Sequence, residues 1–261
     1  MTRPIVELRN VVKTYTMGEA QVHALAGVNI SIMPGDFVAI SGPSGSGKST
    51  CMNLVGCLDL PTSGHIFLSG NDISAMGESE LAGIRGHTIG FIFQQFNLIG
   101  TLTAMENVML PLMFQGKTDA EQLTRARELL NLVDLGDRMH HRPSELSGGQ
   151  QQRVAIARAL ANDPDMILAD EPTGNLDSAT GKHIMELLTK LHQKDKKTIV
   201  LVTHDPSLLS YAERVIRLAD GKVVKDTGAI GSRSNDKGGK HDETTHKEGK
   251  HDDKQRHETK R

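Results

Sequence analysis

The 261-residue sequence contains no tryptophan, only two tyrosines and only two cysteines. Cys51 and Cys57 match neither a CxxC pair nor a histidine-spaced ligand pattern, so a disulfide framework and a zinc site are both disfavoured. This cysteine usage is compatible with a reducing cytosol. No apolar run approaches the roughly 18 residues that a membrane span requires, and the N-terminus contains no signal-peptide core. We therefore expect any membrane role to be peripheral, at the cytoplasmic face of the cell membrane.

A strong net charge is also absent, since the formal value is −2. Residues 229–261 hold nine of the 30 basic and seven of the 32 acidic residues and almost no apolar ones, a composition that cannot bury enough surface to fold. The remainder keeps 21 basic and 25 acidic residues, a net charge of about −4, which does not suggest a nucleic-acid binder. We expect one folded domain over residues 1–228 and a charged, histidine-containing disordered tail over residues 229–261.

Apolar patterning predicts an α/β fold. Residues 5–9 and 28–32 alternate like half-buried strands, whereas continuous apolar runs typical of strands buried on both faces cover residues 37–40, 166–169 and 198–203. A helical pattern over residues 179–194 separates the last two runs, which indicates a parallel βαβ unit. Residues 103–161 are predicted to be mostly helical. The expected architecture is a mainly parallel sheet core with an N-terminal β-rich subdomain and an inserted helical subdomain.

A glycine-rich loop lies between a predicted strand and a helix predicted over residues 49–58. It matches the pattern GxxxxGK[ST] and consists of Gly42, Pro43, Ser44, Gly45, Ser46, Gly47, Lys48, Ser49 and Thr50. Such a loop points successive backbone N–H groups at a phosphate chain, and the helix N-terminus adds its positive dipole end. Lys48 would hold the β- and γ-phosphates, and Ser49 can present its hydroxyl to Mg²⁺. The alternative is a glycine-rich turn that only caps a helix.

A second glycine-opened helix start follows at Leu146, Ser147, Gly148, Gly149 and Gln150, before a helical pattern over residues 151–161. One chain therefore carries two candidate phosphate-binding loops. With these motifs, the sequence resembles the ATP-binding-cassette (ABC) family over residues 5–225, because LSGGQ is the signature of that family. The resemblance implies a P-loop NTPase (RecA-like) core with an antiparallel N-terminal β subdomain, ATP and Mg²⁺ as cofactors, and ATP hydrolysis. It also implies an ATP-dependent head-to-tail homodimer.

The resemblance assigns further residues of the site. Asp170 ends the Walker B strand and would hold Mg²⁺ through water, while Ser49 and Gln94 would contact the ion themselves. Glu171 would polarise the attacking water. Gln94 resembles the Q-loop glutamine, although Gln95 is an alternative, and His204 resembles the histidine that contacts the γ-phosphate. Without the family context, the two carboxylates could simply begin a polar loop and His204 could cap a helix.

Two more assignments follow from the family. Asp177 resembles the D-loop aspartate, which would communicate across the dimer. Tyr15 resembles the aromatic residue that stacks on adenine, with core packing as the alternative. Four histidines recur in the charged tail: His241, His246, His251 and His257. Their spacing matches no closed zinc site, so a solvated tail is favoured over a zinc site.

Segments around residues 17–25, 56–59, 93–98 and 107–112 resemble the lipoprotein-release and macrolide-export group of the family. That group pairs a separate cassette subunit with a membrane permease. Residues 96–112 are the expected docking surface because they carry Phe96, Leu98 and Leu102, with core packing as the alternative. A chromosome-maintenance ATPase would need long heptads between the two motifs, and none is present. A cell-division or signalling cassette that moves no solute stays open as the alternative function.

Overall fold

The computed structural model describes residues 3–18 and 20–228. The chain divides into two units, Met1–Ala229 and Ile230–Arg261, and the second lies outside the described residues. The predicted tail, residues 229–261, with its four histidines, therefore also lies outside them. Within the described part of the chain, no helix combines the length and apolar character needed to cross a membrane.

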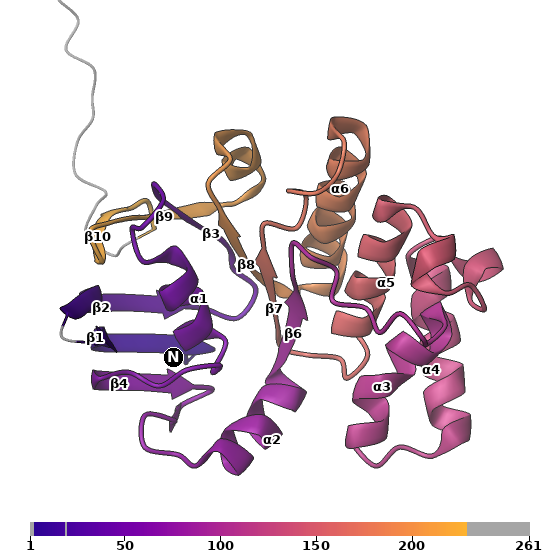
Figure 1. The fold of residues 1–261 in the computed structure, drawn as a ribbon, viewed down its shortest axis with the longest axis horizontal. Helices are drawn as coiled ribbons and strands as arrows, with labels where there is room; N and C mark the ends of the chain where they lie inside the picture. The colour runs from indigo at the N-terminus through magenta and orange to yellow at the C-terminus, as the bar shows by residue number, and fades with distance from the viewer. Residues whose placement is uncertain (1–2, 19, 229–261) are drawn as a thin grey trace, which may run out of the picture. The chain divides into compact units, whose positions relative to one another are not determined.

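A six-stranded sheet forms the centre of the described domain (Figure 1). Its order is β10-β9-β3-β8-β7-β6, and neighbours pair in parallel except for the antiparallel pair of β9 and β10. The predicted parallel core is confirmed. The strands are β3 (Phe37–Ser41), β6 (Ile89–Ile92), β7 (Met166–Asp170), β8 (Thr198–Thr203), β9 (Arg214–Ala219) and β10 (Lys222–Asp226).

The N-terminal β subdomain is a separate antiparallel sheet in the order β2-β1-β4-β5, as the family resemblance implies. Its strands are β1 (Val6–Met17), β2 (Ala20–Ile32), β4 (Ser63–Leu68) and β5 (Asn71–Asp72). The first two are longer than predicted. The reason is that register shifts after Leu8, Val11 and Lys13 break the alternation of side chains, so the apolar pattern is lost although the pairing continues.

Six α-helices surround the sheets within the described residues. They are α1 (Lys48–Val55), α2 (Glu78–Thr88), α3 (Ala104–Phe114), α4 (Asp119–Leu132), α5 (Gly148–Ala159) and α6 (Ser178–Asp195), with 3₁₀ helices η1 (Gly136–Arg138), η2 (Pro143–Glu145) and η3 (Pro206–Tyr211). Helices α3, α4 and α5 pack together as the predicted helical subdomain (Figure 1). Helix α1 is shorter than predicted because Gly56 caps it and Cys57 adopts a positive φ of 53°.

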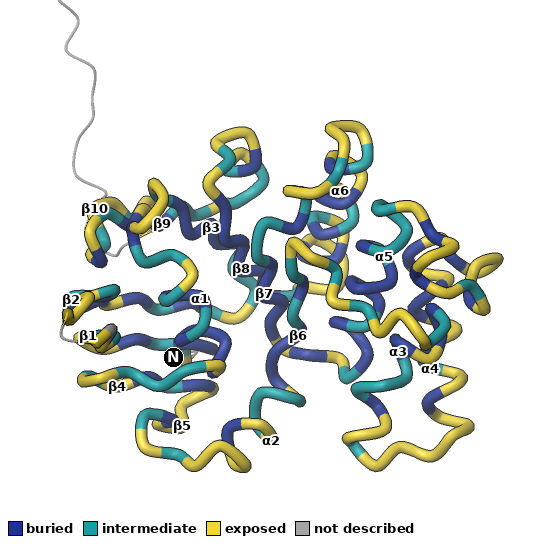
Figure 2. The backbone as a smooth tube through the Cα atoms, viewed as in Figure 1, coloured by how far each residue is buried: buried dark blue, intermediate teal, exposed yellow. Residues whose placement is uncertain are grey.

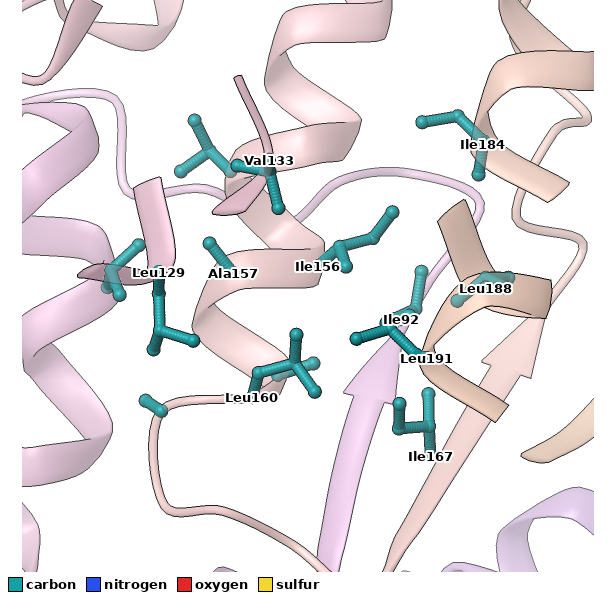
Figure 3. Close-up of a cluster of buried hydrophobic side chains, with 14 of the residues drawn as sticks. Ile92, Leu129, Val133, Ile156, Ala157, Leu160, Ile167, Ile184, Leu188 and Leu191 are labelled. Atoms are coloured by element: carbon teal, nitrogen blue, oxygen red, sulfur yellow. The ribbon is translucent and has the colours of Figure 1, made fainter. Parts of the chain in front are cut away.

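Two buried clusters cover the two faces of the large sheet. Alternate residues of β7 and β8 divide between them: Ile167 and Ile199 join one cluster, and Leu168 and Val200 join the other. Figure 3 shows Ile167 beside Leu188 and Leu191 of α6. The inner strands β3 and β8 are correspondingly buried at every residue, and β7 is buried at all but its last (Figure 2). Burial on both faces explains why β3, β7 and β8 are continuous apolar runs rather than alternating ones.

Candidate active site

The glycine-rich loop lies between β3 and α1, and two of its glycines are required sterically. A Cβ on Gly42 would overlap the carbonyl oxygen of Leu218 in β9, and a Cβ on Gly47 would overlap that of Ala24 in β2. Gly47 also adopts a φ of 95°, in the left-handed region that favours glycine. The backbones of β9 and β2, one strand from each sheet, therefore hold the loop in its shape.

The same loop presents unpaired donors to solvent. Among the described residues, no protein acceptor receives the backbone N–H groups of Ser44, Gly45 and Gly47, and the first two residues are exposed. Lys48 Nζ donates to the carbonyls of Gly42 at 2.9 Å and Pro43 at 2.8 Å, which keeps its charge folded over the loop. Free N–H groups, a lysine and the start of α1 together fit a phosphate chain.

Glu171 and His204 meet at the carboxyl ends of the neighbouring strands β7 and β8. The Oε1 atom of Glu171 accepts from the backbone N–H of His204 at 2.8 Å and lies 2.5 Å from His204 Nδ1. Its Oε2 atom accepts from the Thr203 hydroxyl at 2.9 Å. Glu171 itself adopts a φ of 44°, which is uncommon for a residue with a side chain. The structure thus brings together two of the three predicted catalytic residues.

Asp170 is the last residue of β7 and is half-buried. Burial raises the pKa of Asp170 above its ordinary value, the neighbouring Glu171 charge raises it further, and the Lys48 charge lowers it. A second cation here would relieve the repulsion between the two carboxylates. Within the described residues, no three His, Cys, Asp or Glu side chains could bind a metal on their own. Oxygen donors from Asp170 and Ser49, supplemented by phosphate oxygens, nevertheless suit Mg²⁺.

Gln94, the third predicted catalytic residue, bonds to Asn175, which belongs with Leu176 and Asp177 to the predicted D-loop. Its Nε2 donates to Asn175 Oδ1 at 3.3 Å, and Asn175 Nδ2 donates to the Gln94 carbonyl at 2.9 Å. Gln94, and not Gln95, makes these contacts. The Q-loop and the segment after Glu171 are therefore joined directly.

The signature residues start α5. The Ser147 hydroxyl accepts from the Gln150 N–H at 3.3 Å, and Gln150 Oε1 accepts from the Ser147 N–H at 2.9 Å. This reciprocal pair begins α5 three residues before the predicted start. Asp177 likewise caps α6 by accepting from the N–H groups of Ala179 at 3.1 Å and Thr180 at 3.0 Å. A Cβ on Gly149 would overlap the Thr180 methyl group, so the signature and the D-loop are adjacent.

The signature is not close to the glycine-rich loop of its own chain. In Figure 1, α1 and α5 stand on different sides of the ribbon, with β6, β7 and β8 between them. Among the described elements, α1 packs mainly against β1, β2 and β8, whereas α5 packs mainly against α3, α4, α6 and β6. The described domain therefore holds both candidate phosphate-binding loops without bringing them to a single nucleotide.

Tyr15 lies in β1, is partly exposed and belongs to neither buried cluster, which argues against core packing. Its hydroxyl donates to Asp59 Oδ2 at 2.9 Å. Burial, followed by the bond to Asp59, raises the pKa of Tyr15 above its ordinary value, whereas the Thr50 side chain lowers it. The ring is thus held near the last residue of the glycine-rich loop.

Three residues with contacts at the site have no predicted role. Thr203 donates to Glu171, Asp59 accepts from Tyr15, and the buried Gln152 donates to the Pro172 carbonyl at 2.6 Å. Their partners stand 20 to 44 positions away in the sequence, so no local pattern signals these contacts. A short hydroxyl residue at the end of a strand, as at Thr203, is the one available hint.

Comparisons with known proteins agree on one family. Residues 25–174 match the ABC transporter family. An ABC transporter ATP-binding protein of Thermotoga maritima is 53% identical over 221 residues, which cover 85% of this chain and 94% of the relative. The macrolide export ATP-binding/permease protein MacB of Marinobacter nauticus is 50% identical, but the match covers 87% of this chain and only 35% of MacB.

Solved structures give the same result. The dimeric structure of a post-hydrolysis state of the ATP-binding cassette MJ0796, from Methanocaldococcus jannaschii, bound to ADP and Pi, has a TM-score of 0.79. It is 52% identical, and the match covers 85% of this chain and 97% of that one. A family match over more than half of the chain, together with these relatives, leads to one conclusion: the chain belongs to the ABC transporter family, as one of its ATPase domains.

Proposed function

We propose that this chain is the ATP-hydrolysing subunit of a transporter whose membrane permease is a separate polypeptide. The observation that carries the proposal is the proximity of four charged or polar side chains, while the signature stands apart: Lys48 at the start of α1 and Glu171 both act on the charge of Asp170, and Glu171 contacts His204. This arrangement suits a cassette that completes its site with a second copy. Its place would be at the cytoplasmic face of the membrane, bound to the permease.

In the proposed reaction, the free N–H groups of the glycine-rich loop and Lys48 bind the phosphate chain of ATP. Mg²⁺ would be held by Ser49 and Asp170, with Gln94 nearby, and would supply positive charge to the phosphate oxygens. Glu171 orients and polarises the attacking water, and His204 contacts the γ-phosphate while it fixes the Glu171 carboxylate. The bonds to Thr203 and to the His204 backbone support Glu171 in this role.

The partner at the second half of the site would be another copy of the chain. Ser147, Gly148, Gly149 and Gln150 would reach the γ-phosphate bound by the partner, so that ATP joins the two domains head to tail. The start of α5 adds a positive dipole end to that phosphate. The MJ0796 cassette, itself dimeric in the structure with ADP and Pi, supports this assembly.

The permease would dock in a groove between α2 and α3. The groove has a volume of about 540 Å³, and its lining includes Gly86, Leu110, Phe114 and Arg158. Phe114 is 82% exposed. Exposure of a large apolar side chain does not stabilise an isolated domain, so it favours a partner at this position. The predicted docking segment, residues 96–112, overlaps one wall of this groove. Leu98 packs against the core cluster instead, so the alternative of core packing applies to that residue.

The relatives support the macrolide-export and lipoprotein-release group, and they do not favour the alternative of a cell-division or signalling cassette. The test is to purify the full chain from solubilised membranes of its native cells and to sequence the polypeptides that accompany it. Recovery of a multi-spanning permease, together with Mg²⁺-dependent phosphate release that Glu171→Gln abolishes, is the expected result. Recovery without a membrane partner, or phosphate release that persists in Glu171→Gln, would overturn the proposal.

A further inference from the structure

Behind Tyr15 lies an ion pair that no predicted role explains. Lys13 Nζ donates to Asp59 Oδ1 at 2.6 Å and to the Leu60 carbonyl at 2.8 Å. The other carboxylate oxygen of Asp59 accepts from the Tyr15 hydroxyl at 2.9 Å. The Lys13 and Asp59 side chains are only 13% and 29% exposed. One carboxylate therefore joins the ammonium group and the phenol.

Lys13 also contacts the ring of Tyr15 directly, since its Nζ atom lies 5.0 Å from the ring centroid, a distance typical of a cation–π contact. Asp59 is itself fixed, because its Oδ1 atom accepts from the Leu60 N–H at 2.8 Å. The Tyr15 ring is thus restrained twice, by a hydrogen bond at its hydroxyl and by a cation against its face.

These restraints connect the ring to the helix that follows the glycine-rich loop. Asp59 stands four residues after the end of α1 (Lys48–Val55), in the segment that leads to β4. Thr62 of that segment accepts from the backbone N–H of Thr14 at 3.0 Å, which fixes the segment against β1. Tyr15 is therefore anchored to the same part of the chain as the proposed phosphate site.

We propose that Asp59, supported by Lys13, is a positioning residue that sets the Tyr15 ring as a platform for the adenine base. The proposal rests on the proposed function, in which Tyr15 stacks on adenine. Asp59 acts through Tyr15 and does not touch the nucleotide. An aromatic surface held in place before binding loses less conformational freedom when the base stacks on it, so the contact strengthens binding of the base alone.

The test compares two ligands that are not hydrolysed, ADP and inorganic pyrophosphate, by calorimetry with Mg²⁺ present. In Asp59→Ala, we expect the Kd for ADP to rise about five-fold, because aromatic pairing contributes that order of affinity. The Kd for pyrophosphate, which has no base, should stay unchanged. Asp59→Asn keeps an acceptor for the Tyr15 hydroxyl and should restore most of the ADP affinity.

A double-mutant cycle separates positioning from a general structural role. Tyr15→Phe removes the hydroxyl that Asp59 accepts from, so Asp59→Ala should weaken ADP binding less in that background than in the wild type. Asp72→Ala is the matched control, since Asp72 is an exposed aspartate of the same subdomain whose carboxylate forms a hydrogen bond of 2.8 Å with the His65 ring. That variant should bind ADP like the wild type.

Two outcomes would contradict different statements. If Tyr15→Ala binds ADP as well as the wild type does, the adenine role of Tyr15 in the proposed function is wrong. If Tyr15→Ala weakens ADP binding but Asp59→Ala does not, or if Asp59→Ala weakens ADP and pyrophosphate equally, the positioning role of Asp59 is wrong. Should Asp59→Ala fail to fold, the two single variants Asp59→Asn and Tyr15→Phe still test the positioning role. Tyr15→Phe is expected to weaken ADP binding, whereas Asp59→Asn is not.

Discussion

Lys48 contributes a charge to a partly exposed loop and takes part in neither buried cluster. Lys48→Ala should therefore weaken ATP binding by at least about ten-fold, the effect of losing a charge-assisted contact to phosphate, and should abolish turnover. The fold should be retained. Calorimetry with ATP and a thermal unfolding curve measure both effects. The control is Lys222→Ala, which changes an exposed lysine of β10 and should bind ATP like the wild type. Unchanged ATP affinity in a folded Lys48→Ala variant would contradict the assignment of Lys48 to phosphate binding.

Residues that act within a local motif could be predicted from the sequence, and residues that act through distant contacts could not. A short pattern between a strand and a helix marks Lys48, and the family resemblance, applied to the residues that follow an apolar strand, assigns Glu171. Asp59 and Tyr15 are separated by 44 positions, and their contact exists only because β1 pairs beside the segment after α1. No periodicity or spacing encodes such a pair.

At the scale of elements, β9 and β10 are joined by Arg214 and Asp226. Arg214 donates two bonds to the Asp226 carboxylate, at 2.8 and 2.6 Å, and a third to the Ser31 carbonyl of β2 at 2.6 Å. Burial alone would raise the pKa of Asp226, but the bonds from Arg214 and from the Gly228 N–H outweigh it and hold the pKa below its ordinary value. The pair therefore stabilises the joint between the two sheets.

This pair predicts a pH dependence of stability. Because the folded-state pKa of Asp226 is depressed, its contribution is present above the ordinary carboxyl pKa and is lost as the pH falls through the folded value. Asp226→Asn should lower the free energy of unfolding by about 1–3 kcal/mol at pH 7, and the difference from the wild type should shrink in acid. Urea denaturation across that range measures it. The control Asp137→Asn, which removes an exposed ion pair with Arg138, should change the free energy of unfolding little. The prediction is contradicted if Asp226→Asn is as much less stable than the wild type in acid as it is at pH 7.

The existence of the elements could be predicted better than their ends. β8 coincides with the predicted strand because an entirely buried run has clear limits. The far ends of β1 and β2 were missed because their bulges break the alternation, and the start of α5 was missed because Ser147 caps it across two glycines that are poor helix formers. Helix and strand ends depend on caps and bulges, which override the average pattern.

For the whole molecule, the sequence predicts the α/β core and the helical insertion, but its patterns do not show that the two candidate phosphate-binding loops lie apart in the fold. None of the predicted site residues lies in residues 229–261. Deleting that segment should therefore leave the ATPase rate within about two-fold of the full-length chain, as for a segment too polar to build a folded site. Steady-state phosphate release measures the ATPase rate of both chains. Loss of activity on truncation would show that the segment has a function, and so would a tight, stoichiometric zinc site in the intact chain.

The last prediction concerns how two copies complete the site. Glu171→Gln keeps the size of the side chain but removes the carboxylate that would polarise water, so this variant should bind ATP, scarcely hydrolyse it and accumulate as a dimer. With ADP, which lacks the bridging γ-phosphate, it should stay mostly monomeric. Adding Ser147→Arg should abolish the dimer by placing a long side chain where the partner's nucleotide would lie.

Because Ser147 also caps α5, the arginine has two effects, and the loss of the cap alone lowers stability by about 1 kcal/mol. Ser147→Ala in the same Glu171→Gln background separates the effect of bulk from the loss of the hydroxyl, which removes both the cap and one proposed contact to the partner's γ-phosphate. Because the N–H groups at the start of α5 remain, this variant should still dimerise at saturating ATP, although more weakly than Glu171→Gln alone. Size-exclusion chromatography with light scattering distinguishes the states. A Glu171→Gln variant that stays monomeric with ATP, or that dimerises equally with ADP, would contradict the composite site, because the γ-phosphate would then not join the signature of one copy to the glycine-rich loop of the other.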